Sequence, residues 1–161
     1  MTIQSLAQVA GEALLSRGWM LATAESCTGG GIAAAITEIS GSSQWFERGF
    51  VTYSNQAKQD MLGVSAQTLD TVGAVSEATV REMVSGALAQ SEAQVALAVS
   101  GIAGPTGGTP EKPVGMVYLA WALKGQTPVT VIEQFSGDRQ TIRNRAVERA
   151  LQGLLDIIQG H

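Results

Sequence analysis

Ala22-Thr23-Ala24-Glu25-Ser26-Cys27-Thr28-Gly29-Gly30-Gly31 is the stretch that decides the fold. An apolar run at residues 19–22 precedes it and a helix-forming run at residues 32–36 follows it, which predicts a strand, a tight turn and a helix that extends to about Ser40 and ends at Gly41. Glycines let the backbone approach a bound group, and a helix N-terminus adds free N–H groups and about half a positive charge. We therefore expect an anion, or an oxygen that becomes anionic, to be stabilised near Ser26. The alternative is a glycine-rich turn with a helix cap and no ligand.

The composition indicates a compact protein of one domain, residues 1–161. Hydrophobic residues make up 45% of the chain and charged residues only 15%, which argues against disorder. The formal net charge of −4 and the absence of a run of Lys or Arg argue against a nucleic-acid partner.

The N-terminal residues and the cysteine count predict a cytoplasmic protein. Residues 1–6 lack the basic and long apolar regions of a signal peptide, and no apolar run has the length of a membrane span. We therefore expect no membrane partner. The single Cys27 excludes an internal disulfide, which is consistent with a reducing compartment.

The only histidine is His161, the last residue, where chain ends fray. Its position argues against Ser-His-Asp and Cys-His catalysis and against zinc sites that use histidine or several cysteines. A nucleophilic enzyme with this sequence would need Lys, Tyr, Asp or Glu as its base. The chain has just three lysines: Lys58, Lys112 and Lys124.

A second strand and helix follow the same pattern as the first pair. Residues 48–53 alternate and are rich in β-formers, which predicts a strand, and Ser54-Asn55 are good caps for the helix that follows. Tyr53 then lies at the carboxyl end of the strand and Lys58 on the first turns of the helix. Ligands of open α/β sheets bind at the carboxyl ends of strands, so Lys58 is a candidate base. Its alternative role is that of a solvated surface charge.

The second half of the chain predicts a glycine-rich loop and a hairpin. The apolar run at residues 95–99 is typical of a strand buried on both faces, and it leads into Ser100-Gly101-Ile102-Ala103-Gly104-Pro105-Thr106-Gly107-Gly108. This loop matches neither the dinucleotide fingerprint nor the P-loop. Residues 114–123 and 129–135, joined by a turn at residues 124–126, predict a β-hairpin and therefore a mixed sheet.

Arg139 and Arg143 lie four residues apart near the start of the last predicted helix. Positive charges oppose the dipole at a helix N-terminus, so an anionic ligand there would relieve them. The alternative is a pair of exposed arginines that form ion pairs with Asp138 or Glu148.

Six segments resemble, in order, the signatures of the CinA C-terminal domain family, and the resemblance covers nearly the whole chain. They are Ala24-Glu25-Ser26-Cys27-Thr28-Gly29-Gly30, residues 50–55 with Lys58, residues 73–76, Ser100-Gly101-Ile102-Ala103-Gly104-Pro105, residues 112–115, and residues 135–139 with Arg143.

The resemblance implies a fold and an activity. The fold of this family is a three-layer α/β/α sandwich, here with a mixed sheet that includes a C-terminal β-hairpin. Stand-alone members are nicotinamide-nucleotide amidohydrolases, which hydrolyse the carboxamide of nicotinamide mononucleotide to nicotinic acid mononucleotide and ammonia in pyridine nucleotide recycling. This chemistry needs no metal and no cofactor, and no set of metal ligands is evident in the sequence.

The resemblance also implies the roles of individual residues. Ser26 would be the nucleophile, Lys58 its base and Tyr53 a helper, with oxyanion donors from the turn glycines. The absence of a histidine before the last residue agrees with a lysine base, and Lys58 is the one lysine at a strand-end cap. The residues expected to bind substrate are Thr28, Gly29, Gly30, Ser100, Gly101, Gly104, Arg139 and Arg143.

Three alternatives stay open at this point. The chain could be a phosphate-handling enzyme of another reaction class, or a nucleotide-binding or interaction domain without catalysis. Cys27 could also be the nucleophile, although it lacks a histidine partner and more often such a residue is a small buried side chain. As partners we expect a small-molecule nucleotide and a second copy of the chain, in a dimeric homo-oligomer.

Overall fold

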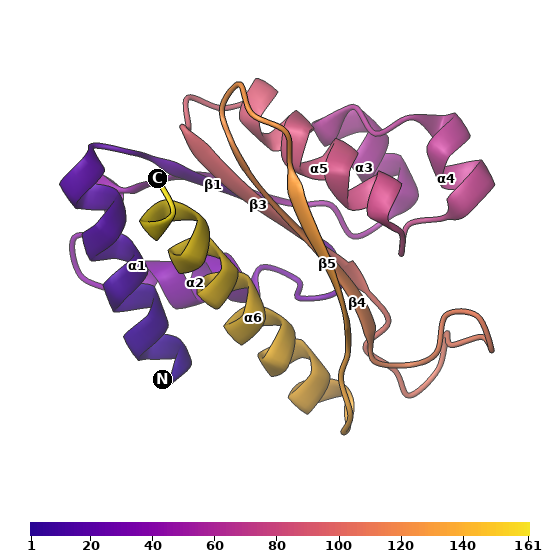
Figure 1. Cartoon of the computed structure of the whole chain (residues 1–161). Helices are drawn as coiled ribbons and strands as arrows, with labels where there is room; N and C mark the ends of the chain where they lie inside the picture. The colour runs from indigo at the N-terminus through magenta and orange to yellow at the C-terminus, as the bar shows by residue number, and fades with distance from the viewer.

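In the computed structural model, which describes residues 1–161, a five-stranded mixed sheet lies between two layers of helices (Figure 1). The strands are β1 (Leu21–Glu25), β2 (Phe46–Val51), β3 (Val95–Gly101), β4 (Met116–Leu123) and β5 (Val129–Gln134). Their order in the sheet is β2-β1-β3-β4-β5. The first three are parallel, and β4 and β5 are antiparallel. The predicted α/β fold, with a mixed sheet and a C-terminal hairpin, is confirmed.

Three helices lie on each side of the sheet, so the predicted three-layer arrangement is also confirmed (Figure 1). One layer contains α1 (Ile3–Arg17), α2 (Gly31–Thr37) and α6 (Arg139–Gln159). The other contains α3 (Asn55–Leu62), α4 (Ala66–Val72) and α5 (Glu77–Ala89). A short 3₁₀ turn, η1 (Ser42–Gln44), leads into β2.

The two faces of the sheet carry side chains of different size because successive residues of a strand point to opposite faces. Toward α1, α2 and α6 the central strands present Leu21, Leu97, Leu119 and Trp121. Toward α5 they present mainly small side chains, namely Ala22, Ala24, Ala96, Ala98, Ala120 and Ala122, with Tyr118 packed at the margin. The alternation of bulky residues with alanine therefore determines which face receives which helices.

Two element boundaries differ from the prediction. The second helix was predicted to extend to about residue 40, whereas α2 ends at Thr37. The Thr37 hydroxyl donates to the carbonyls of Ala33 and Ala34, and such a bond competes with continued helix. The strand predicted at residues 48–53 is β2 at Phe46–Val51, so Tyr53 lies beyond the strand end. The helix cap predicted at Ser54 is confirmed.

The parallel strands determine where the functional residues meet. Strands β2, β1 and β3 are neighbours and run in the same direction, so their carboxyl ends lie at one edge of the sheet. The glycine turn after β1, the connection from β2 to α3 and the long loop after β3 all begin at this edge. The predicted site residues come from these connections, from the end of β3 and from the first turns of α3 and α6.

Candidate active site

Ser26 is the first residue after β1, and the backbone holds it from both sides. Its N–H donates to the carbonyl of Val99 in β3, at 3.1 Å. On the other side, the N–H of Thr52 donates to the carbonyl of Glu25, at 2.8 Å. The pairing of β1 thus continues one residue past the strand, and Ser26 is 8% exposed. The position of its hydroxyl is set by the sheet as well as by the turn.

Lys58 extends from α3 to Ser26 and is 1% exposed. Its Nζ lies 2.9 Å from the Ser26 Oγ, 2.8 Å from the carbonyl oxygen of Thr52 and 3.2 Å from that of Tyr53. None of the ion pairs of the structure involves Lys58. Burial lowers the pKa of the Lys58 ammonium below its ordinary value of 10.5.

The three oxygens around Lys58 can serve both protonation states, because an ammonium would donate to all three and a neutral amine to two of them. A neutral amine has two N–H donors and one lone pair. The carbonyls of Thr52 and Tyr53 can accept both N–H groups, which leaves the lone pair for the Ser26 hydroxyl. This arrangement can remove a proton from Ser26, as general-base activation of a hydroxyl nucleophile requires.

Cys27 is buried beside Ser26, and burial raises the pKa of its thiol to about 11. A thiol with such a pKa stays protonated near neutral pH, and only the thiolate is strongly nucleophilic. The environment of Cys27 therefore argues against the alternative in which it is the nucleophile.

The N-terminus of α2 is occupied by a side chain of the protein, which the sequence prediction missed. The N–H groups of Ile32 and Ala33 donate to the Glu25 carboxylate at 2.9 and 3.0 Å, and the Thr28 hydroxyl donates to it at 2.5 Å. The helix N–H groups expected to be free for an anion are thus already bonded. The sequence does carry a sign of this cap, namely an acidic residue, Glu25, shortly before a helix that begins with glycine.

The backbone donors that remain free belong to the turn. Gly29 N–H donates to the carbonyl of Ser26 and Gly31 N–H to that of Thr28. The N–H groups of Cys27, Thr28 and Gly30 donate to no backbone carbonyl. The turn needs glycine at Gly29 and Gly30, whose φ values are +59° and +99°. These free N–H groups are the available donors for a developing oxyanion beside Ser26.

Arg139 and Arg143, which the sequence could not distinguish, have different roles in the structure. Arg143 donates from Nε to the carbonyl of Cys27 at 3.1 Å and from Nη2 to that of Thr28 at 3.2 Å. Arg139 donates from Nη1 to the carbonyl of Gly104 at 2.7 Å. Neither forms an ion pair, so the alternative of pairing with Asp138 or Glu148 is wrong. Arg143 braces the turn that follows Ser26, and Arg139 contacts the second glycine-rich loop.

Tyr53 joins two parts of the site. Its carbonyl contacts Lys58, and its hydroxyl accepts a hydrogen bond from Arg139 Nη2 at 3.2 Å. The residue is 61% exposed. The structure thus connects Tyr53 to the Ser26 site through its backbone, while its hydroxyl lies beside Arg139.

Ser100 and Gly101 form the end of β3, next to the Val99 carbonyl that binds Ser26. Ser100 is buried, and a Cβ on Gly101 would clash with Val117 and the backbone of Met116. In the loop that follows, none of the N–H groups of residues 103–108 donates to a backbone carbonyl. The free N–H groups of this loop and the Arg139 guanidinium are a second set of hydrogen-bond donors at the same edge of the sheet.

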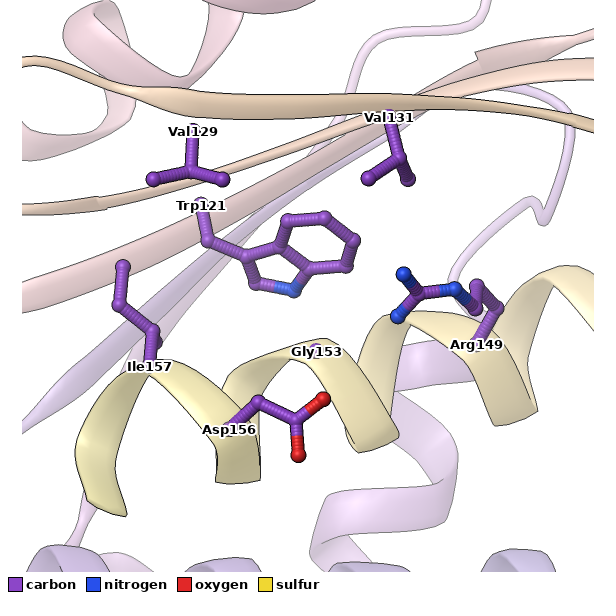
Figure 2. Close-up of a pocket in the computed structure, with 7 residues that line it drawn as sticks. All are labelled: Trp121, Val129, Val131, Arg149, Gly153, Asp156 and Ile157. Carbon is purple, nitrogen blue, oxygen red and sulfur yellow. The ribbon is translucent and has the colours of Figure 1, made fainter. Parts of the chain in front are cut away.

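Other regions of the structure do not contribute to this site. No group of three or more His, Cys, Asp or Glu side chains is placed to hold a metal ion. None of the helices combines the length and the hydrophobicity that crossing a membrane requires. A cavity of about 230 Å³ lies between β5 and the C-terminal half of α6, with Trp121 at its centre (Figure 2). Neither Ser26 nor Lys58 lines it.

Comparisons with known proteins identify relatives along almost the entire chain. A family model described as "CinA C-terminal domain" matches residues 3–158. The nicotinamide-nucleotide amidohydrolase PncC of Enterobacter agglomerans is 56% identical over 145 residues, which cover 90% of this chain and 88% of that protein. The protein of the same name from Escherichia coli (strain K12) is 53% identical over 152 residues, covering 94% and 92% of the two chains.

A solved structure of a competence-damaged protein (CinA) superfamily member from Klebsiella pneumoniae has the same fold. Its TM-score to this structure is 0.96, with 39% sequence identity and complete coverage of both chains.

Proposed function

The chain belongs to the CinA C-terminal domain family, and we propose that it is a nicotinamide-nucleotide amidohydrolase that converts nicotinamide mononucleotide to nicotinic acid mononucleotide and ammonia. The contact of 2.9 Å between Ser26 Oγ and Lys58 Nζ carries this proposal. A binding domain without catalysis would not need a buried lysine beside a serine, because burying an amine without a carboxylate partner destabilises the fold. The relatives named as amidohydrolases, at more than half identity, support the same reaction.

The reaction would proceed through an acyl-enzyme. Neutral Lys58 takes the Ser26 proton while Oγ attacks the carboxamide carbon, and an anionic tetrahedral intermediate forms. Lys58 then returns the proton to the amide nitrogen, the C–N bond breaks and ammonia leaves. Water attacks the resulting ester with Lys58 again as base, and the proton passes to Ser26 Oγ as nicotinic acid mononucleotide is released.

The turn after Ser26 would stabilise the tetrahedral oxyanion. Its free N–H groups are those of Cys27, Thr28 and Gly30. The Arg143 guanidinium bonds to the carbonyl of Cys27, which belongs to the same peptide group as the Thr28 N–H. Withdrawal of electrons from that carbonyl makes the Thr28 N–H a stronger donor. Arg143 would therefore act on the oxyanion through the backbone.

The second glycine-rich loop and Arg139 would bind the 5′-phosphate of the substrate. Backbone N–H groups of residues 103–108 and the Arg139 guanidinium are suitable donors for a phosphate. Arg143 is already bonded to two carbonyls, and the N-terminus of α2 is bonded to Glu25. Those two groups are thus less suited to the phosphate. Tyr53, which contacts both Lys58 and Arg139, would be the helper that links the two subsites.

The remaining expectations are a single domain, a cytoplasmic homodimer and a role in pyridine nucleotide recycling. Light scattering of the purified protein tests the dimer. Measurement of nucleotide pools in a deletion strain tests the role.

Ammonia release from nicotinamide mononucleotide tests the proposed reaction directly. We expect the wild-type protein to yield ammonia and nicotinic acid mononucleotide in equal amounts. Ser26→Ala should lower kcat by at least about 10³-fold and still bind the nucleotide, because only the nucleophile is removed. If the wild-type protein released no ammonia from the nucleotide, the function proposed here would be wrong.

A further inference from the structure

We propose that Glu25 is a positioning residue that fixes the turn carrying Ser26, a role that rests on the function proposed above. Its carboxylate, 1% exposed, accepts hydrogen bonds from the Thr28 hydroxyl and from the N–H groups of Ile32 and Ala33. No arginine or lysine forms an ion pair with it. All of these bonds are made to the turn and to the first turn of α2.

The glycines of the turn explain why a strand residue caps this helix. The N-cap position of α2 is Gly30, whose φ of +99° favours glycine, and no side-chain cap forms there. A serine or an aspartate at that position would strain the backbone. Glu25, the last residue of β1, supplies the missing acceptor from the opposite end of the turn.

The hydrogen bonds of Glu25 join the two ends of the chain segment that contains Ser26. Ser26 follows Glu25 directly, and the three donors lie three, seven and eight residues further along the chain. The residue before Ser26 is therefore joined both to the middle of the turn and to the helix that ends it. Arg143 holds the carbonyls of Cys27 and Thr28 in the same turn. The Ser26 hydroxyl and the oxyanion donors are consequently fixed relative to each other by two charged side chains.

This arrangement predicts a catalytic effect of Glu25 that exceeds its effect on folding. Misplacement of a reacting group by about 1 Å can lower a rate on the order of 10²-fold. Loss of the Glu25 cap would let the turn relax, while the phosphate subsite at Arg139 would keep its geometry. We therefore expect kcat to fall and KM for nicotinamide mononucleotide to change little.

Glu82 offers a matched control. Its carboxylate accepts hydrogen bonds from the Ser65 N–H at 2.8 Å and from the Thr68 hydroxyl at 2.6 Å, at the start of α4, where the Ser65 hydroxyl caps the helix N–H groups. Neither bond involves a residue of the proposed site. Glu25→Gln and Glu82→Gln thus make the same chemical change at two carboxylates that each bond a backbone N–H and a threonine hydroxyl at the start of a helix.

The experiment compares kcat, KM and Tm of Glu25→Gln, Glu82→Gln, Thr28→Val and Thr28→Ser, with nicotinamide mononucleotide as substrate and well below every Tm. We expect Glu25→Gln and Thr28→Val to lower kcat by about 10- to 100-fold with KM within about twofold of wild type. Thr28→Ser keeps the hydroxyl and should recover most of the loss seen in Thr28→Val. Glu82→Gln should lower Tm and leave kcat unchanged.

The proposal is overturned if Glu25→Gln affects kcat no more than Glu82→Gln does. If Glu25→Gln does not fold, the comparison of Thr28→Val with Thr28→Ser decides, and equal kcat values for these two variants overturn the proposal. A wild-type protein without amidase activity would contradict the proposed function instead, so the two failures are distinguishable.

Discussion

The Lys58 amine and the Ser26 hydroxyl lie 2.9 Å apart although 32 residues separate them in the chain. They meet because β1 and β2 are parallel neighbours, so the turn after β1 and the start of α3 after β2 lie at the same edge of the sheet. The contact is buried, and its other partners are the backbone carbonyls of Thr52 and Tyr53. The predictions below concern this pair and the residues that surround it.

Lys58→Arg and Lys58→Met should both lower kcat on the order of 10²–10⁴-fold, because neither side chain accepts a proton near neutral pH. Activity of the wild-type enzyme should rise with pH through one ionisation below 10.5, since burial lowers the pKa of Lys58. The measurement is kcat/KM for nicotinamide mononucleotide against pH. An active Lys58→Arg enzyme with an unchanged pH profile would show that Lys58 is not the base.

Lys58 should also make the stability of the protein depend on pH. Its pKa is lower in the folded protein than in the unfolded chain, so the unfolded chain binds more protons between the two values. The free energy of unfolding therefore rises with pH in that window, by up to about 1.4 kcal/mol per pH unit. Below the window, the buried amine costs stability.

Lys58→Met should remove this contribution. Urea unfolding of both proteins at several pH values up to 10.5 measures it, and we expect the wild-type curve to rise more steeply. The variant should be at least as stable as the wild type at neutral pH. Parallel curves would contradict a lowered pKa of Lys58.

Cys27→Ala should retain activity close to that of the wild type, because burial raises the thiol pKa to about 11 and the thiol stays protonated. Loss of a buried thiol should reduce Tm slightly. The check is kcat at neutral pH together with the rate of labelling by a thiol reagent, which we expect to be slow. A large loss of kcat in the folded variant would bring back Cys27 as a candidate nucleophile.

Arg139→Gln should weaken binding of the phosphorylated substrate more than that of its riboside. The guanidinium is the exposed charge beside the second glycine-rich loop, and a charge-assisted bond to phosphate contributes about 1.5–3 kcal/mol. We expect kcat/KM for nicotinamide mononucleotide to fall by about tenfold or more. The riboside should be a poor substrate of both proteins.

Arg145→Gln is the control for this change, because Arg145 is exposed on the same helix and forms no ion pair. Its kcat/KM should equal that of the wild type. If both arginine variants weakened the reaction equally, the effect would come from net charge and not from a phosphate site at Arg139.

Gly153→Ala should destabilise the fold without changing the site. A Cβ at Gly153 would lie 2.1 Å from the ring of Trp121, and overpacking of this kind costs about 1–3 kcal/mol. Gly160→Ala, near the end of α6, would bring the Cβ no closer than 3.4 Å to another atom and should change stability by less than about 0.5 kcal/mol. Thermal unfolding of the two variants checks this; equal Tm values would contradict the packing of Trp121 against α6.

Much of the fold could be predicted from local sequence signals. The strand, glycine turn and helix around Ser26, the fully buried strand β3 and the C-terminal hairpin each have a clear pattern over a few residues. The end of α2 was predicted less well because it depends on hydrogen bonds from the Thr37 side chain. Such bonds compete with the backbone pattern and leave no periodic signal.

The sequence alone excluded histidine as a base, since the one histidine is the last residue, and it limited a lysine base to three candidates. Only the tertiary structure decided the rest, because burial and hydrogen-bond partners are properties of the packed chain. Packing places Lys58 against Ser26 and lowers the pKa of the lysine. It also turns the Glu25 carboxylate toward the start of α2. Packing also separates two arginines that look alike in sequence, with Arg143 bonded to the turn after Ser26 and Arg139 to the loop after β3.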